Sequence, residues 1–346
     1  MRIVKVVDPR VIKGWNEQML RLKGHSIFHS SNWAEVLSGV YGYKPVYFTL
    51  YEAGEIKGVI PMLEVDSFIT GKRGVSLPFS DTCEPLVQDG SAFQSLLEAV
   101  RNYAKSNDWK YYEVRGGSQF FDTAIKPSSV FYEHKLPLVT NLEESFKALR
   151  SNTKRGVKKS VKEQIKNEVS KRKEAVEAFY RLNCLTRRRH GLPPQPVAFF
   201  KKLHEVIIQK DLGFIVNTSF EGRAVASGVF LHFGDEIIYK YGASDFSYQL
   251  KRPSYAMLWQ GISKAHELGF KALNLGRTDI DNQGLRNFKL GWRPQEHEVN
   301  YYKYSMKAGR YVKDSAKVGS FYNTIFRHMP DLLLRLTGKL AYRHIA

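Results

Sequence analysis

The chain has 346 residues, of which 43% are hydrophobic and 13% aromatic, and its formal net charge is +19. This length and apolar content exclude a disordered protein and are sufficient for about two globular domains. The charged start, with Arg2 and Lys5, argues against a signal peptide, and no apolar run approaches the ~20 residues of a membrane span. The two distant cysteines, Cys83 and Cys184, favour a reduced compartment. We therefore expect a cytoplasmic protein.

The first part of the chain predicts an α/β domain comprising residues 1–140. Its expected elements, in chain order, are a helix over 31–40 capped by Ser30 or Ser31, a hairpin over 46–65 turning at Ala53-Gly54, a functional loop over 69–85, a helix over 92–106, and strands over 110–114 and 131–139. The hairpin is predicted because apolar and polar residues alternate on both sides of its turn.

The second part predicts another α/β domain over residues 141–305. The spacing Asn141-x-x-Glu144 is typical of a helix N-cap. The elements expected after it are a basic helix from about Arg150, helices over 174–187 and 197–210, a hairpin over 213–231, a strand over 236–242, a helix over 254–268 and a strand over 271–275. Residues 306–346 form a basic tail, in which Pro330 separates two short helices.

One arrangement of elements occurs twice. The helix-then-strand segment at 97–116 recurs 161 positions later, at 258–277, and each copy follows a hairpin with glycine at its bend. Internal repeats of this kind indicate one fold used twice. The sequence therefore predicts tandem α/β domains, each with a mixed central sheet flanked by helices. A chance similarity between two α/β segments is the alternative.

Positive charge is concentrated in three places. Residues 150–173 hold ten Lys/Arg against two Glu, residues 187–190 read RRRH, and the chain from Tyr301 onward holds nine Lys/Arg against two Asp. Basic surfaces bind anionic partners such as nucleic acid, phosphate-rich ligands or acidic membranes, although a single basic run is often only a solvated helix face. The candidates for nucleic-acid contact are Arg150, Lys154, Arg155, Lys158 and Lys159.

The most specific motif is NLGRTDIDNQGLRNFKLGW at 274–292, which we expect to leave a strand into a glycine-punctuated loop. Small residues allow the backbone to approach a ligand, and a cation beside an aromatic ring can hold a phosphate or polarise a carbonyl. The motif offers Arg277, Asp279, Arg286, Phe288 and Lys289 for such contacts. A structural loop carrying a solvated lysine is the alternative.

With its Phe-Lys-x-Gly-Trp end, this motif resembles the closing segment of the Fem (FemAB/FemX) family, whose members have two domains of the GNAT acyltransferase fold. FHSSNWAEVL at 28–37 resembles the family's tryptophan-bearing helix, and RSNTKRGV at 150–157 resembles the opening of its second domain. The resemblance extends to about residue 303. It implies tandem GNAT-like domains and transfer of an amino acid from aminoacyl-tRNA to a peptidoglycan precursor. It also implies that Lys289 lies near the acyl-transfer site, with Phe288 beside it.

One departure from the family concerns the position four residues after Trp33. The family often has a lysine there that contacts the phosphates of the nucleotide-sugar precursor, whereas this chain has Leu37. The identity of the precursor therefore stays open. The basic region is also too short for the coiled-coil insertion of some family members.

A second class of donor, acyl-CoA, requires a different motif. Conventional GNAT enzymes bind pyrophosphate through the backbone amides of a Gln/Arg-x-x-Gly-x-Gly/Ala segment at a helix start. The equivalent stretch, QLKRPSY at 249–255, has Pro253 and Ser254 at the glycine positions, and proline has no amide proton. Lys251 and Arg252 are the candidates for side-chain contact with a phosphate. An acyl-CoA-dependent N-acyltransferase acting on an amino sugar therefore stays as an alternative.

The predicted function is acyl or aminoacyl transfer to an amino group of a cell-envelope precursor, a peptidoglycan or polysaccharide intermediate. Lys289 is the candidate for stabilising the oxyanion, and Asp279 for orienting or deprotonating the amine. The candidates for substrate or donor binding are Phe288, Arg286, Arg277, Lys251, Arg252, Tyr241 and Trp33. We expect no metal, because the histidines lack metal-binding spacing. We also expect no tightly bound cofactor, with aminoacyl-tRNA or acyl-CoA as the donor. A non-catalytic RNA- or phosphate-binding protein is the alternative from another class.

The tail predicts an amphipathic helix over 331–344. Its apolar residues include Leu332, Leu333, Leu336 and Leu340, and its cations include Arg335 and Lys339. Such a helix either packs its apolar face on the domains or lies in a membrane interface, where apolar burial and attraction to anionic lipid add. The second alternative would place the protein peripherally on the inner face of the membrane.

Overall fold

The computed structural model describes residues 2–138, 141–313 and 320–344, and the chain folds into two compact units. Unit 1 comprises Met1–Tyr132, Glu298–Ala316 and Ala341–Ala346, and unit 2 comprises Glu133–His297 and Lys317–Leu340. The chain passes from one unit to the other within the strands β8 (Ser129–Pro137) and β14 (Gln295–Ser305). The boundaries expected from the sequence, at residues 140 and 305, are not the positions at which these units meet. Residues 306–346, the expected tail, belong partly to unit 1 and partly to unit 2.

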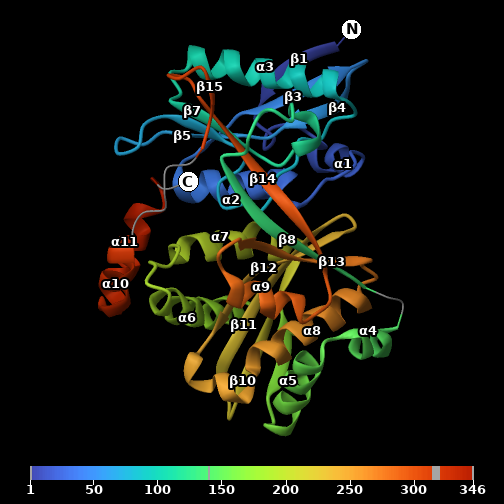
Figure 1. Ribbon diagram of the computed structural model, residues 1–346, viewed down its shortest axis with the longest axis vertical. Helices are drawn as coiled ribbons and strands as arrows, with labels where there is room; N and C mark the ends of the chain where they lie inside the picture. Colours follow the sequence, from blue (N-terminus) through green and yellow to red (C-terminus); the bar gives the residue numbers. More distant parts are fainter. Residues whose placement is uncertain (1, 139–140, 314–319, 345–346) are drawn as a thin grey trace. The chain divides into compact units, whose positions relative to one another are not determined.

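Unit 1 is a mixed α/β structure (Figure 1). Its elements are β1 (Arg2–Val7), α1 (Trp15–Leu20), η1 (Ile27–His29), α2 (Ser31–Tyr41), β2 (Lys44–Pro45), β3 (Tyr47–Glu52), β4 (Glu55–Ile60), β5 (Leu63–Val65), β6 (Arg73–Val75), α3 (Gly90–Ser106), β7 (Tyr111–Arg115), η2 (Ser118–Phe120) and β15 (Arg310–Val312), with parts of β8 and β14. Strands β1, β3 and β4 form one sheet in the order β1-β3-β4. The others follow the order β2-β5-β6-β7-β14, in which β6 and β7 are parallel.

Local sequence explains the main elements of unit 1. Ala53 and Gly54 adopt positive φ angles of 50° and 83°, which is the geometry of a tight hairpin turn and confirms the expected bend. Asp89 caps α3 by accepting a hydrogen bond from the amide of Ala92 at 2.7 Å. The apolar face of α3 packs on β3 and β4, and Trp109 completes this core. The expected hairpin and the helix-then-strand segment of unit 1 are therefore confirmed.

Unit 2 contains the second copy of the arrangement. Its elements are α4 (Leu142–Ala148), α5 (Ser151–Lys162), β9 (Lys166–Ser170), α6 (Lys173–Arg189), α7 (Val197–Val206), η3 (Ile208–Lys210), β10 (Gly213–Phe220), β11 (Arg223–Phe233), β12 (Glu236–Ser244), η4 (Phe246–Lys251), α8 (Pro253–Glu267), β13 (Ala272–Asp279), α9 (Gln283–Leu290), α10 (Ser320–His328) and α11 (Asp331–Ala341), with parts of β8 and β14. The strand order is β8-β13-β12-β11-β10-β9. The pairs from β9 to β12 are antiparallel, and β12 and β13 are parallel.

Helices cover both faces of the unit 2 sheet, as the sequence predicts (Figure 1). On one face, Phe230 of β11 packs so closely on α8 that a Cβ at Gly261 would lie 2.0 Å from its ring. On the other face, the ring of Tyr241 packs against Phe179 of α6 and Phe200 of α7. The copies in the two units differ in one respect. In unit 2 the hairpin β10–β11 belongs to the same sheet as β13, whereas in unit 1 the hairpin β3–β4 lies in a different sheet from β7.

Residues 150–173 are not one basic helix, and this expectation was wrong. Helix α5 ends at Lys162, Gln164 has a positive φ of 57°, and residues 166–170 form the edge strand β9. Strand β9 pairs antiparallel with β10, so that Val169 lies opposite Val216. Pairing with a strand distant in sequence therefore overrides the helical propensity of this Lys-rich segment.

The tail contains the two expected helices, α10 and α11, on either side of Pro330. Residues 314–319 and 345–346 of the expected tail lie outside the described residues. Of the helices in the described part of the chain, none combines the length and apolar character needed to cross a bilayer.

Candidate functional site

The two parallel strands at the centre of unit 2 pair over a very short stretch. Strands β12 and β13 are in register only at Ile237↔Leu273 and Ile238↔Asn274. Both strands are described in full and continue beyond these pairs, to Ser244 and Asp279, without pairing with each other. Backbone groups released from a ladder need other partners, and a ligand can supply them. The parting of β12 and β13 therefore marks a place where an extended ligand can insert between strands.

A β-bulge lies on the same stretch of β12. Val229 of β11 is opposite Tyr241 and Phe230 is opposite Tyr239, so that Lys240 is the extra residue. Such an insertion interrupts the hydrogen-bond ladder between the strands and changes the direction of the neighbouring side chains. Gly242 lets the Tyr239 side chain lie against it, because a Cβ at this position would lie 1.8 Å from the Tyr239 hydroxyl oxygen and the side chain would have to shift. Burial raises the pKa of the Tyr239 phenol, so this residue stays neutral at physiological pH.

The segment expected to be a loop after β13 is mostly a helix, and this expectation was wrong. Asn282 caps α9 by accepting a hydrogen bond from the amide of Leu285 at 3.1 Å. Lys289, in the last turn of α9, is only 4% exposed and is not a solvated side chain. Its Nζ donates to the carbonyl oxygens of Gly276 at 2.8 Å and Arg277 at 3.0 Å. Lys289 thus ties α9 to the open end of β13.

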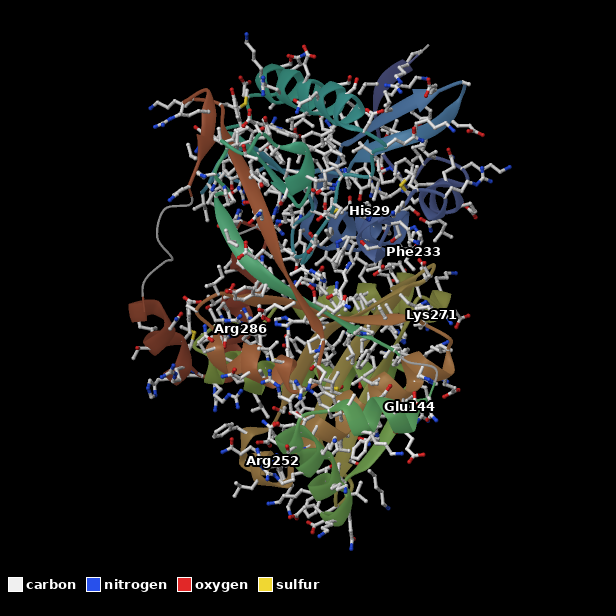
Figure 2. All side chains as sticks on the ribbon, turned by 45° about the vertical axis from the view of Figure 1, so that its right-hand side comes forward. His29, Glu144, Phe233, Arg252, Lys271 and Arg286 are labelled. Carbon is white, nitrogen blue, oxygen red and sulfur yellow. The ribbon has the colours of Figure 1, made fainter. Side chains whose placement is uncertain are left out.

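Arg286, which is labelled in Figure 2, lies one turn before Lys289 and belongs to a charged cluster. Its guanidinium donates to both carboxylate oxygens of Glu296, from Nε at 2.8 Å and from Nη2 at 2.6 Å. Glu296 is also 3.0 Å from Nε2 of His134, whose side chain is fully buried. This bidentate pair occupies the guanidinium, which indicates a positioning role for Arg286 more than direct ligand binding.

Electrostatics within this cluster fix the charge of its members. The hydrogen bond from Arg286 lowers the pKa of Glu296, and His134 lowers it further. Burial lowers the pKa of His134, and the charge of Lys289 adds to this effect. His134 is therefore neutral and Glu296 ionised at pH 7. The sequence contained no signal for either residue, since 162 positions separate His134 from Glu296.

We expect Glu296→Gln to lower the unfolding temperature at pH 7, with a loss of about 1–2 kcal/mol, because the charge-assisted bonds to Arg286 are lost. The pKa of Glu296 is lowered in the folded state, so its stabilising contribution is complete above the ordinary carboxyl pKa and disappears as the pH falls through the lowered value. The difference between wild type and variant should therefore shrink in acid. Thermal unfolding across pH measures it, with the exposed Glu298→Gln as control; a difference that is independent of pH would contradict the assignment.

Aromatic packing connects the helices around α9. Phe288 lies 5.3 Å from the ring of Tyr255 in α8 and 6.1 Å from that of Trp292. Helix α5 approaches α8 closely, because a Cβ at Gly156 would lie 2.7 Å from the Tyr255 ring. Phe288 thus contributes to the packing that holds Lys289 in place.

The start of α8 contains two candidate phosphate-binding cations. Lys251 forms an ion pair with Glu163 at 2.9 Å and lies over the ring of Phe220 at 4.1 Å. Arg252 is exposed, with a positive φ of 62°, immediately before Pro253 (Figure 2). Of the two cations, Arg252 is therefore the one presented to solvent at the helix N-terminus.

Three other candidates have different surroundings. Trp33 is fully buried in unit 1, 5.0 Å from the ring of Phe28, and Leu37 beside it is also buried. These positions form core, and the structure does not support substrate contact by Trp33. Tyr241 packs among the aromatic rings of α6 and α7, which favours a packing role. Arg277 and Asp279 are half-buried at the open end of β13.

The exposed face of α5 is strongly basic. Its inward face consists of Thr153, Gly156, Val157 and Ser160, at helical spacing. The outward face carries Arg155, Lys158, Lys159 and Lys162, while Lys154 is half-buried and Arg150 precedes the helix. In the described part of the chain, none of the four outward cations lies within ion-pair distance of a carboxylate. Their charge is therefore available to an anionic partner.

Known proteins share this architecture. Residues 147–290 match the acetyltransferase (GNAT) domain family. The crystal structure of FemX superposes with a TM-score of 0.70 at 13% identity, covering 89% of this chain and 98% of FemX. The C-terminal domain of a putative lysylphosphatidylglycerol synthetase from Agrobacterium fabrum gives 0.55 at 12% identity, with coverage of 93% and 94%. A tandem GNAT protein of the clavulanic acid pathway gives 0.57 at 8% identity, with coverage of 88% and 98%.

No curated protein sequence matches the chain. The structural likenesses confirm the expected tandem GNAT fold, and the match over residues 147–290 confirms the expected enzyme class. The parting of two parallel strands, the bulge beside it and the helix that starts at Pro253 all lie within this matched region. The chain is therefore an acyltransferase of tandem GNAT fold, FemX-like in its architecture.

Proposed function

We propose that this protein transfers an acyl or aminoacyl group to an amino group of a cell-envelope precursor, such as a peptidoglycan or polysaccharide intermediate. The observation that carries the proposal is the open end of β12 and β13 in unit 2, with Lys289 bound to the backbone of β13. Support for a cell-envelope acceptor comes from two of the structural neighbours, FemX and the putative lysylphosphatidylglycerol synthetase.

The transfer requires a neutral amine that attacks the carbonyl carbon of the donor. A new C–N bond forms while the bond from that carbon to the donor's oxygen or sulfur breaks, and the amine proton leaves for a base or for the departing group. The oxyanion formed in between is stabilised by nearby dipoles and positive charge. We assign this role to the charge of Lys289 together with backbone amides beside the bulge, and we assign orientation of the amine to Asp279.

Aminoacyl-tRNA is the donor that the surface charge favours. The outward face of α5 offers Arg155, Lys158, Lys159 and Lys162 to a phosphate backbone. The start of α8 is less suited to CoA pyrophosphate than that of a conventional GNAT enzyme, because Pro253 removes one amide donor.

Acyl-CoA is the second candidate donor, and two observations favour it. Arg252 is exposed at the N-terminus of α8, where a helix dipole attracts phosphate. The domain that matches residues 147–290 is described as an acetyltransferase. An enzyme that uses this donor would acylate an amino sugar.

Competition binding distinguishes the two donors. We expect the full-length protein to bind labelled aminoacyl-tRNA, and we expect unlabelled aminoacyl-tRNA to displace it at lower concentration than acetyl-CoA does. Tighter binding of acetyl-CoA, together with acetylation of a glucosamine acceptor, would establish the second candidate. Binding of RNA without transfer to any amine would contradict the enzymatic proposal and leave the non-catalytic RNA-binding alternative.

A membrane-bound acceptor would also explain a peripheral location. Peptidoglycan intermediates include lipid-linked forms, so we further propose that the protein works at the inner face of the membrane. The tail is the segment that would make this contact.

A further inference from the structure

Helix α11 is fixed to unit 2 along one side. Leu334 and Gly338 are buried, and a Cβ at Gly338 would lie 2.0 Å from the carbonyl oxygen of Pro194. The preceding helix, α10, is held in the same way, because a Cβ at Gly191 would lie 2.1 Å from the carbonyl oxygen of Asn323. The glycines permit these close approaches. The tail is therefore docked on the turn that follows α6, and α11 has a defined orientation.

The opposite side of α11 is an exposed stripe of leucines, which we call the leucine face. Its members are Leu332, Leu333, Leu336 and Leu340, which are 81%, 54%, 51% and 63% exposed. At 100° per residue, Leu332, Leu336 and Leu340 follow one line along the helix, and Leu333 lies beside it. Monomeric proteins rarely leave such a contiguous apolar surface on one helix without a partner. The packing alternative expected for the tail thus explains the buried side of α11 and not the leucine face.

The surroundings of the leucine face are positive. Lys339 is exposed and borders the stripe, and Arg327 is exposed at the end of α10. Asp331, the single acidic residue of α11, is neutralised by Arg335 at 2.7 Å.

We propose that the leucine face of α11 docks on an anionic membrane surface. Leucines enter the boundary between headgroups and acyl chains, while the flanking cations interact with anionic headgroups. A second copy of the chain fits less well, since a two-fold contact would bring these cations against their symmetry mates. The proposal names the surface through which the protein would contact the membrane. It rests on the proposed function only for the reason that such contact would be useful, namely a membrane-bound acceptor.

Vesicle binding of the full chain tests the proposal. Wild type should sediment with vesicles of phosphatidylcholine containing phosphatidylglycerol, and weakly or not at all with phosphatidylcholine alone. The double variant Leu332→Gln/Leu336→Gln should bind the anionic vesicles at least about tenfold more weakly, because two leucines no longer transfer from water. Both residues are exposed, so the fold is unaffected. The matched control is Leu268→Gln, an exposed leucine at the end of α8, which should bind like wild type.

Three results would overturn the proposal. These are equal binding by the double variant and wild type, equal binding of wild type to neutral and anionic vesicles, and a wild-type dimer in sedimentation without lipid that the double variant abolishes. The variant Lys339→Glu tests the electrostatic contribution and should weaken binding to anionic vesicles only.

These measurements use neither the donor nor the acceptor of the proposed reaction. A negative result in vesicle binding would therefore not contradict the proposed transfer, and a negative result in a transfer assay would not contradict membrane docking.

Discussion

Lys289→Met is expected to lower the rate of transfer by about 100- to 1000-fold, the effect of removing one preorganised charge or donor from an oxyanion site. The methionine keeps the apolar stem of the side chain in its buried position and removes only the ammonium group. Single-turnover transfer to a soluble amine acceptor measures the effect on chemistry apart from substrate binding. Lys271→Met, which changes an exposed lysine of unit 2, is the control and should retain full activity.

Lys289→Ala should, in addition, destabilise the fold. Methionine and alanine both remove the ammonium group that donates to the carbonyl oxygens of Gly276 and Arg277, and alanine also leaves a cavity in place of the buried stem. Such changes typically cost about 2–4 kcal/mol. A solvated lysine in a loop, the alternative that the sequence left open, would be dispensable for folding, whereas Lys289 is buried. A methionine variant that folds and turns over normally would show that Lys289 has no catalytic part.

Reversal of charge on α5 is expected to produce the second large effect. The triple variant Lys158→Glu/Lys159→Glu/Lys162→Glu should bind tRNA at least about tenfold more weakly at low salt. The slope of log affinity against log salt should decrease in magnitude by about 0.7–0.9 for each phosphate that the variant no longer neutralises. All three lysines are exposed and outside the inward face of the helix, so packing on α8 is retained. Filter binding over a range of salt concentrations gives both quantities.

The control for this experiment changes net charge equally. Lys201, Lys210 and Lys271 are also exposed lysines of unit 2, outside α5. Their triple reversal to glutamate should affect tRNA binding less than the α5 variant does, because only the long-range field changes. If both triple variants bind tRNA equally well, or if wild-type affinity does not depend on salt, α5 is a solvated face. The acyl-CoA alternative would then be the better account of the donor.

Residues that are neighbours in sequence largely determine the elements of this protein. The bend at Ala53-Gly54 follows from the freedom of glycine at positive φ, and α3 begins where Asp89 supplies a cap. Pro330 separates α10 from α11 because proline cannot continue a helix. The alternation of hairpin, helix and strand was also sufficient to predict the tandem α/β architecture, which the structural likenesses confirm.

Tertiary structure decided what those elements do. Residues 166–170 became a strand because β10 offered an edge. Lys289 became buried because the carbonyl oxygens of Gly276 and Arg277 in β13 accept hydrogen bonds from its ammonium group. The cluster of Arg286, Glu296 and His134 depends on strands and a helix that only folding brings together. The amphipathic pattern of α11 was visible in sequence, but which of its leucines stay exposed depends on contacts with the turn after α6. Local patterns encode caps, turns and periodicity, whereas burial and charge pairing depend on residues far apart in the chain.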